Sequence, residues 1–125
     1  MGMERNYIRL TGTVERKQGY YIATIHELPL AVQGQDRDGT ISEILKALTA
    51  YLEANKRLGQ MDSVANQTGY SGQNPEERFD RLLSALRDHT KAIEQKGEVT
   101  HPVKRITWEP GNSGAEQKFV LELVV

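Results

Sequence analysis

Cysteine is absent from this chain of 125 residues, which excludes disulfides and thiolate-ligated metal sites. Long apolar runs are also lacking, so we expect neither a signal peptide nor a membrane span, and a cytoplasmic protein. Charge of one sign is not in excess, because 16 Lys and Arg stand against 17 Asp and Glu and the basic residues are scattered. A large nucleic-acid-binding surface is therefore not expected.

Catalytic and cofactor motifs are missing as well. The three histidines, His26, His89 and His101, are far apart, and no second histidine follows His26-Glu27 at the spacing of a zinc protease. The chain has no nucleophile elbow, phosphate-binding loop or dinucleotide fingerprint. We therefore expect a protein that is not an enzyme, with no catalytic residues, no cofactor and no metal. His26 is expected at the surface and His89 in the core or an interface.

The chain does contain clear hydrophobic periods. Alternation of apolar and polar residues predicts a hairpin of strands over residues 7–16 and 20–27, and a third strand over residues 30–34. A helical period follows and ends at Gly59. The apolar face predicted for this helix comprises Ile41, Ile44, Leu45, Leu48, Tyr51, Leu52 and Leu58.

The second half adds a helix and two strands. Residues 60–74 are polar and rich in Gly, Ser, Asn and Gln, which predicts a surface loop. Asn74-Pro75 then begins a helix that ends near Gly97, and residues 103–109 and 118–125 form a closing hairpin. The apolar face of this helix comprises Phe79, Leu82, Leu83, Leu86 and Ile93. The order βββ-α-α-ββ predicts one α+β domain over the whole chain, with both helices on one face of an antiparallel sheet.

The stretch GQDRDGTISEIL, residues 34–45, resembles part of a calcium-binding loop. With Gly39 at the sixth loop position, Asp36 and Asp38 fall on ligand positions, but the first and twelfth positions are Gly34 and Leu45, which lack oxygen side chains. We therefore expect no calcium site. The stretch is better explained as a turn into the helix.

Local capping rules also suggest where that helix begins. Thr40 has the side chain of an N-cap residue, and Glu43 stands three residues later. This spacing is that of a capping box, in which the two residues satisfy each other's backbone donors. We therefore expect the helix to begin with Thr40 as its N-cap.

Residues 20–54, YYIATIHELPLAVQG to TAYLEA, resemble the HicB-like antitoxin family. The matching pieces are Glu27-Leu28-Pro29, Val32-Gln33-Gly34, Thr40, Glu43 and Tyr51-Leu52-Glu53. Leu30-Ala31 stands where many members have Gly-Cys, and QDRDG is an insertion before Thr40. The resemblance covers about the first half of the chain. It implies a single HicB-like domain whose C-terminal half, with its second helix and terminal hairpin, is an elaboration.

The resemblance also implies a function. Family members are non-catalytic, usually dimeric proteins that neutralise a small RNA-cleaving toxin, often with a separate DNA-binding element. Here residues 60–74 separate the two helices too widely for a helix-turn-helix, so direct DNA binding is not expected. We expect the chain to contact a small basic ribonuclease through Glu27, Asp36 and Asp38, whose charges would speed encounter.

An alternative is a stand-alone oligomeric or scaffold protein of the same fold with no toxin partner. The inserted turn and the missing DNA-binding element favour this alternative. In either case we expect a homodimer or higher homo-oligomer, because an open sheet this small leaves edge strands, and the final segment KFVLELVV is an apolar edge strand that needs covering.

Overall fold

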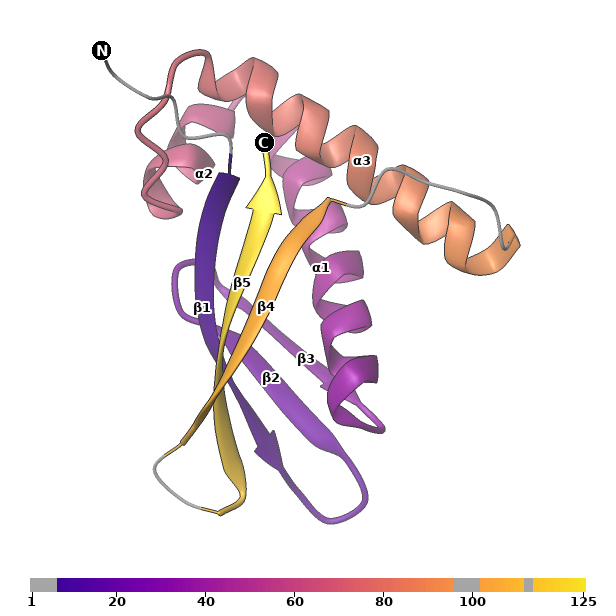
Figure 1. Cartoon of the computed structure of the whole chain (residues 1–125). Helices are drawn as coiled ribbons and strands as arrows, with labels where there is room; N and C mark the ends of the chain where they lie inside the picture. Colours follow the sequence, from indigo (N-terminus) through magenta and orange to yellow (C-terminus); the bar gives the residue numbers. More distant parts are fainter. Residues whose placement is uncertain (1–6, 96–101, 112–113) are drawn as a thin grey trace.

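A computed structural model of the chain describes residues 7–95, 102–111 and 114–125. Five strands form one antiparallel sheet in the order β3-β2-β1-β5-β4, and three helices accompany it (Figure 1). The strands are β1 (Tyr7–Arg16), β2 (Tyr21–Ile25), β3 (Leu30–Gly34), β4 (Val103–Pro110) and β5 (Glu116–Val124). The helices are α1 (Arg37–Arg57), α2 (Met61–Gln67) and α3 (Pro75–Gln95). The α+β class and the antiparallel sheet are thus confirmed.

Alternation along β1 decides which side of the sheet is buried. Ile8, Leu10 and Val14 are each at most 2% exposed, whereas Arg9 and Glu15, on the opposite side of the strand, are exposed. Since successive side chains of a strand point to opposite faces, one face of the sheet is apolar and the other polar. The apolar face forms the core with the helices.

Gly12 interrupts the apolar series on β1, and an aromatic ring occupies the space that its side chain would need. Gly12 is paired with Phe119 of β5, and a Cβ at Gly12 would lie 2.4 Å from Phe119 Cζ and 2.3 Å from the carbonyl oxygen of Thr24. The ring of Phe119 also packs against Trp108, with the two centroids 5.7 Å apart. The missing side chain is therefore replaced by cross-strand aromatic packing.

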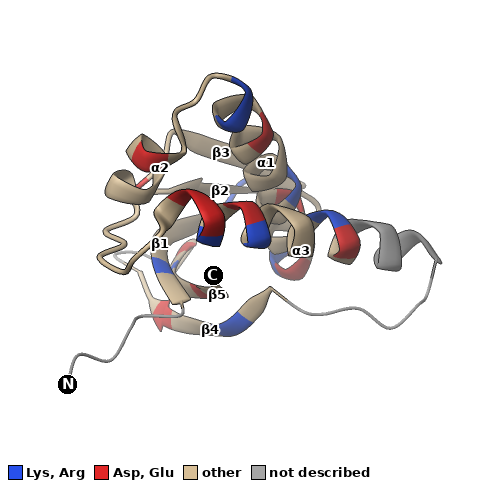
Figure 2. Ribbon diagram, turned by 90° about the horizontal axis from the view of Figure 1, so that it is seen from above, with Lys and Arg blue, Asp and Glu red and all other residues tan. Residues whose placement is uncertain are grey.

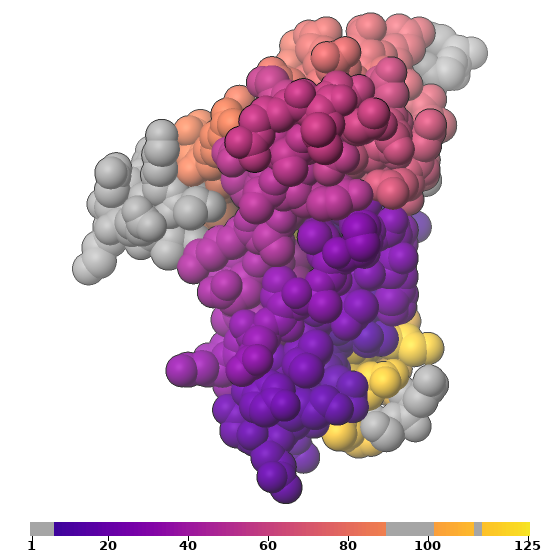
Figure 3. Space-filling model, turned by 180° about the vertical axis from the view of Figure 1, so that it is seen from behind, coloured from indigo at the N-terminus to yellow at the C-terminus, as the bar shows by residue number. Residues whose placement is uncertain are grey.

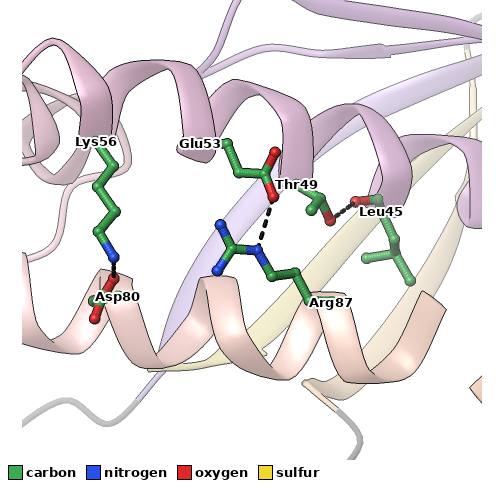
Figure 4. Close-up of polar contacts among 6 residues, drawn as sticks. All are labelled: Leu45, Thr49, Glu53, Lys56, Asp80 and Arg87. Carbon is green, nitrogen blue, oxygen red and sulfur yellow. Dashed lines mark hydrogen bonds and ion pairs between the residues drawn. The ribbon is translucent and has the colours of Figure 1, made fainter. Parts of the chain in front are cut away.

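The helices cover the apolar face unequally. α1 packs on β2 and β3, while α3 runs across α1 and α2 near the end of the sheet where the chain terminates (Figure 1). Two ion pairs tie α1 to α3, one between Lys56 and Asp80 and the other between Arg87 Nε and Glu53 Oε1 at 2.7 Å (Figure 4). Both pairs are partly exposed, so each contributes about 0–1 kcal/mol and the apolar seam between the helices dominates. None of the helices within the described ranges combines the length and the apolar character that a bilayer crossing requires.

The C-terminal strand does not lie at an edge. β5 pairs with β1 on one side and β4 on the other, so the edge strands are β3 and β4. The expectation that KFVLELVV needs covering as an exposed edge is therefore wrong. β4 and β1 pair with its backbone on both sides, and its inward side chains Phe119, Leu121 and Leu123 are buried in the core, whereas Val124 on the opposite face is 44% exposed.

The segment of residues 60–74 is not a continuous loop, because residues 61–67 form α2. Met61, Val64 and Ala65 of this helix are 1–3% exposed and belong to the same core as the sheet. Their spacing of three and four residues places them on one side of a helix, and α2 packs on α1 and α3. Viewed from behind, this segment (magenta) lies above the strands drawn in indigo and purple (Figure 3). Tertiary burial therefore outweighs the polar composition of the segment.

Helix α1 begins earlier than Thr40. Its N-cap is Asp36, whose Oδ1 accepts a hydrogen bond from Gly39 N at 2.5 Å. Thr40 lies inside the first turn, fully buried, and its hydroxyl donates to the carbonyl oxygens of Asp36 and Arg37. The predicted capping box is therefore wrong, and Glu43 instead pairs with Lys46 at 3.3 Å.

Two other side chains predicted on the apolar helix faces, Leu58 and Ile93, are not found buried in the described part of the structure. Leu58 is the C-cap of α1 and is 72% exposed, so it is not on the apolar face predicted for it. α3 buries Phe79, Leu82, Leu83 and Leu86, as its period predicts. The side chain of Ile93 and the predicted end at Gly97 lie outside what the structure describes.

The cap can be tested by comparing two aspartates of the same turn. We expect Asp36→Ala to lower the free energy of unfolding by about 1 kcal/mol, because the Gly39 N–H loses its acceptor. Asp38→Ala is the matched control, since its side chain is 93% exposed and its nearest ion-pair distance is 4.0 Å. Urea denaturation of both variants measures the difference. Equal unfolding midpoints would contradict the assignment of Asp36 as the cap.

Candidate functional site

Glu27, the first of the three residues expected to contact a partner, has its carboxylate bound within the fold. Its Oε1 accepts a hydrogen bond from Thr11 N at 2.8 Å and its Oε2 accepts one from the Thr11 hydroxyl at 2.7 Å. His26 N donates to Thr11 O at 2.9 Å in the same place. Where β2 separates from β1, the Glu27 carboxylate therefore accepts the hydrogen bond from Thr11 N that a backbone carbonyl of β2 would otherwise accept. Glu27 stabilises the strand end, and its charge is less available to a partner than the sequence suggests.

Asp36 and Asp38 lie at the other end of β3. Glu27 precedes this strand and Asp36 follows it, so the length of five residues, roughly 16 Å, separates them. Asp36 is exposed but caps α1, and the side chain of Asp38 is 93% exposed. The structure therefore does not bring the three predicted residues together into one patch.

A different acidic surface is formed where the three helices meet. An open cleft of about 580 Å³ lies between the end of α1 and the beginnings of α2 and α3. Its lining residues are Lys56, Met61, Asp62, Asn74, Pro75, Glu76, Glu77 and Asp80. Figure 2 shows acidic residues on α2 and on the neighbouring end of α3. We call this feature the acidic cleft.

Charge in the acidic cleft is negative. Two of its four carboxylates are paired, Asp80 with Lys56 and Glu77 with Arg81 at 3.0 Å. Asp62 and Glu76 are exposed, and no ion pair within the described part of the chain involves either of them. A cation entering the cleft would therefore meet two carboxylates that no described ion pair already engages.

The wall of the cleft is held in place by buried contacts. Tyr70 is 8% exposed, its ring meets Phe79 edge-on with centroids 5.7 Å apart, and its hydroxyl donates to the carbonyl oxygen of Gln73 at 2.8 Å. Asn74 has a φ of 52°, and its carbonyl accepts from Arg78 N in the first turn of α3. The connection between α2 and α3 is thus anchored on both sides. Such anchoring reduces the conformational entropy that a partner must remove on binding.

The sequence contains only a weak indication of this cleft. Glu76 and Glu77 have the positions of carboxylates that stabilise the first turn of a helix, and Asp62 lies in a segment predicted as a loop. A weak signal was available, since acidic residues begin two neighbouring helices. Their proximity to Lys56 and Asp80 depends on how α1, α2 and α3 pack.

The described histidines and Lys17 lie outside the acidic cleft. His26 is exposed, with its Nδ1 3.4 Å from the Thr11 hydroxyl, and His89 is half-buried, whereas His101 lies outside the described residues. Within the described ranges, no group of three His, Asp or Glu side chains is arranged to hold a metal ion. The pKa of Lys17 is raised because its ammonium donates to the Glu15 carboxylate, whose charge also attracts it. This pair stands on an exposed hairpin and belongs to no cleft.

The motif residues occupy turns and helix ends. Glu27-Leu28-Pro29 connects β2 to β3, Val32-Gln33-Gly34 ends β3, and Tyr51-Leu52-Glu53 lies near the end of α1. At Gly34 a Cβ would lie 2.8 Å from Thr40 N, so this glycine allows the chain to turn closely into α1. No family model, curated protein or solved structure matches the chain significantly.

Proposed function

We propose that the chain is a non-catalytic, HicB-like inhibitor that binds a small basic RNA-cleaving toxin. The observation that carries this proposal is the acidic cleft, where Asp62 and Glu76 offer carboxylate charge on an anchored concave surface. A basic ribonuclease presents Lys and Arg side chains, and complementary charge both speeds association and favours one orientation of the complex. The resemblance of residues 20–54 to the antitoxin family supports the same class of partner.

Binding at the cleft has a physical advantage over binding at the predicted residues. Glu27 and Asp36 already accept hydrogen bonds from the backbone, so a cation there would compete with contacts that stabilise the fold. Asp62 and Glu76 can be approached without breaking any described ion pair. The half-buried ring of Pro75 adds apolar surface to the cleft. The stem of a Lys or Arg can lie against such surface while its charge meets the carboxylates.

The experiment begins with the reading frame next to this gene, if that frame encodes a small basic protein. Expression of the neighbour alone should stop growth, co-expression of this chain should restore it, and the two proteins should co-purify. The antitoxin role fails if the neighbour is harmless alone or if the proteins do not associate. The scaffold alternative then takes its place.

Charge reversal locates the contact within such a complex. We expect Asp62→Lys with Glu76→Lys to weaken association roughly 10- to 100-fold, because like charges then face each other across the interface. Asp38→Lys, also a reversal of an exposed carboxylate, should change affinity less than about threefold, since a distant charge is screened by salt. Calorimetric titration measures both. A larger effect at Asp38 would move the contact to the turn between β3 and α1.

A specific observation favours the second candidate, a stand-alone oligomeric scaffold. One face of the sheet carries no described helix, and its side chains combine small polar residues with charges of both signs. Such a face is available for association with a protein surface. The scaffold candidate predicts oligomers in the absence of any toxin, whereas the inhibitor proposal is independent of the state of that face.

A further inference from the structure

The face of the sheet that turns away from the helices has an ordered pattern of charge. The strand pairing places its outward side chains in rows across β1, β5 and β4. One row contains Arg9, Glu122 and Arg105, in which Arg9 Nη2 lies 3.7 Å and Arg105 Nε 3.6 Å from the Glu122 carboxylate. Beside them, Lys104 Nζ lies 3.8 Å from the ring centroid of Tyr7. This end of the face therefore has three cations around one carboxylate.

The opposite end of the same face is richer in carboxylates. Glu109 of β4 stands beside Lys118 of β5, and Glu15 of β1 stands beside Glu116 in the next row. Lys17 pairs with Glu15 at 2.8 Å from the adjoining turn. Between the two ends, the middle row of the face has no charge. It consists of Thr11, Val120 and Thr107.

We propose that this open face is the interface between two copies of the chain, related by a two-fold axis that runs across the strands along the middle row. Rotation about this axis brings the cationic end of one copy over the carboxylate end of the other. Arg105 then faces Glu109 of the second copy, and Glu109 faces its Arg105, because a two-fold interface makes each contact twice. An axis parallel to the strands would place the cationic ends over each other. Charge complementarity therefore selects the first arrangement.

The area of the face suits a dimer. Strands about 4.8 Å apart and five to ten residues long give a face of roughly 24 by 24 Å, or about 600 Å² for each copy. The total, about 1,200 Å², is at the lower end of the range for specific protein interfaces. Val120 and the row of small threonines allow two sheets to approach at the usual separation of about 10 Å.

The edges of the sheet are poorly suited to pairing. β4 has an irregular register between Val103 and Arg105, exposes Lys104, and ends in Pro110, which has no N–H to donate. β3 has only five residues. Short, bulged or charged edges are features that hinder strand addition, so association through the face is favoured over association through an edge.

Nucleic acid fits the face less well than a second copy does. Single-stranded RNA or DNA is bound through aromatic rings on which bases stack. Among the outward side chains on the described strands only Tyr7 is aromatic, and Lys104 lies over its ring. The carboxylates of Glu15, Glu109 and Glu116 would also repel a phosphate backbone.

The test is a charge swap in the full chain, followed by sedimentation equilibrium. The unaltered protein should show a concentration-dependent mass approaching twice the chain mass of 14.1 kDa. Glu109→Arg places arginines opposite each other and should raise the dimer dissociation constant roughly tenfold or more, as should Arg105→Glu. The double variant with both changes restores opposite charges across the axis and should dimerise more tightly than either single variant.

A matched control excludes a general effect of charge. Arg81→Glu reverses an arginine on α3 that is 65% exposed, against 66% for Arg105, and should leave dimerisation unchanged. Circular dichroism of each variant checks that the chain is folded. Glu109→Arg is the cleaner single variant, because Glu109 takes no part in the ion pairs that Glu122 makes with Arg9 and Arg105. A mass of 14.1 kDa at all concentrations overturns the proposal. The proposal is also overturned if neither single variant changes the dimer dissociation constant, or if the double variant dimerises no more tightly than the single variants.

Discussion

Gly12→Ala is expected to destabilise the protein by about 3 kcal/mol, at the upper end of the cost of adding a methyl group to a packed core. The new Cβ would lie 2.3 Å from the Thr24 carbonyl oxygen and 2.4 Å from Phe119 Cζ. The carbonyl oxygen belongs to the backbone of β2 and is fixed by the pairing of β1 with β2. The ring of Phe119 is 1% exposed and is held by Trp108. Neither neighbour can move without disrupting the sheet.

Gly114→Ala provides the control for this substitution. A Cβ at Gly114 has no atom within 4 Å, so the same change there should alter the free energy of unfolding by less than about 0.5 kcal/mol. Thermal unfolding of both variants measures the contrast, with a decrease of about 10 °C expected for Gly12→Ala. A melting temperature unchanged by Gly12→Ala would mean that the strands β1 and β5 are not paired in this register.

Leu83→Ala should cost about 3–4 kcal/mol, because it removes a side chain that is 0% exposed and leaves a cavity between α3 and the rest of the core. This variant tests whether the second half of the chain is part of one cooperative domain. If it is, urea denaturation should show a single transition at a lower midpoint, monitored both by circular dichroism and by Trp108 fluorescence.

Leu58→Ala is the matched control for Leu83→Ala. Leu58 is 72% exposed at the end of α1, so the same loss of side-chain atoms should change stability by less than about 0.5 kcal/mol. The description of one cooperative core would be wrong if Leu83→Ala changed the free energy of unfolding as little as Leu58→Ala does. It would also be wrong if α3 melted in a separate transition that left the Trp108 signal unchanged.

The proposed inhibitor function and the proposed dimer involve different surfaces. The acidic cleft lies between the ends of the helices, and the charged rows lie on the face of the sheet that the helices leave uncovered. A toxin could therefore bind each copy of a dimer without competing for the dimer interface. Failure of the cleft variants to affect toxin binding would leave the dimer proposal intact, and the reverse also holds.

The sequence by itself determined the types of the regular elements wherever the hydrophobic period was strong. Period two gave β1 with its correct bounds, because every second residue from Ile8 to Val14 except Gly12 is apolar. Period 3.6 gave α1 and α3, and Pro75 marked the first residue of α3, since proline has no N–H to lose there. These signals are local, in that a period shows which side of an element is buried without showing what covers it.

The tertiary structure alone decided what each buried side packs against. β5 lies between β1 and β4, where its inward apolar residues are buried, and no local pattern distinguishes this order from one in which β5 is the edge strand. Residues 61–67 are helical because Met61, Val64 and Ala65 find an apolar surface on α3, although their neighbours are polar.

The cap and the candidate sites depended on the same long-range packing. Asp36 rather than Thr40 caps α1 because the close turn at Gly34 buries Thr40 inside the first turn. Asp62 and Glu76 share a cleft, and Arg105 and Glu109 lie on one open face, only because distant segments are brought together. Contacts between residues far apart in the chain form because they minimise the apolar area that the whole fold exposes. A local hydrophobic period contains no information about that total area.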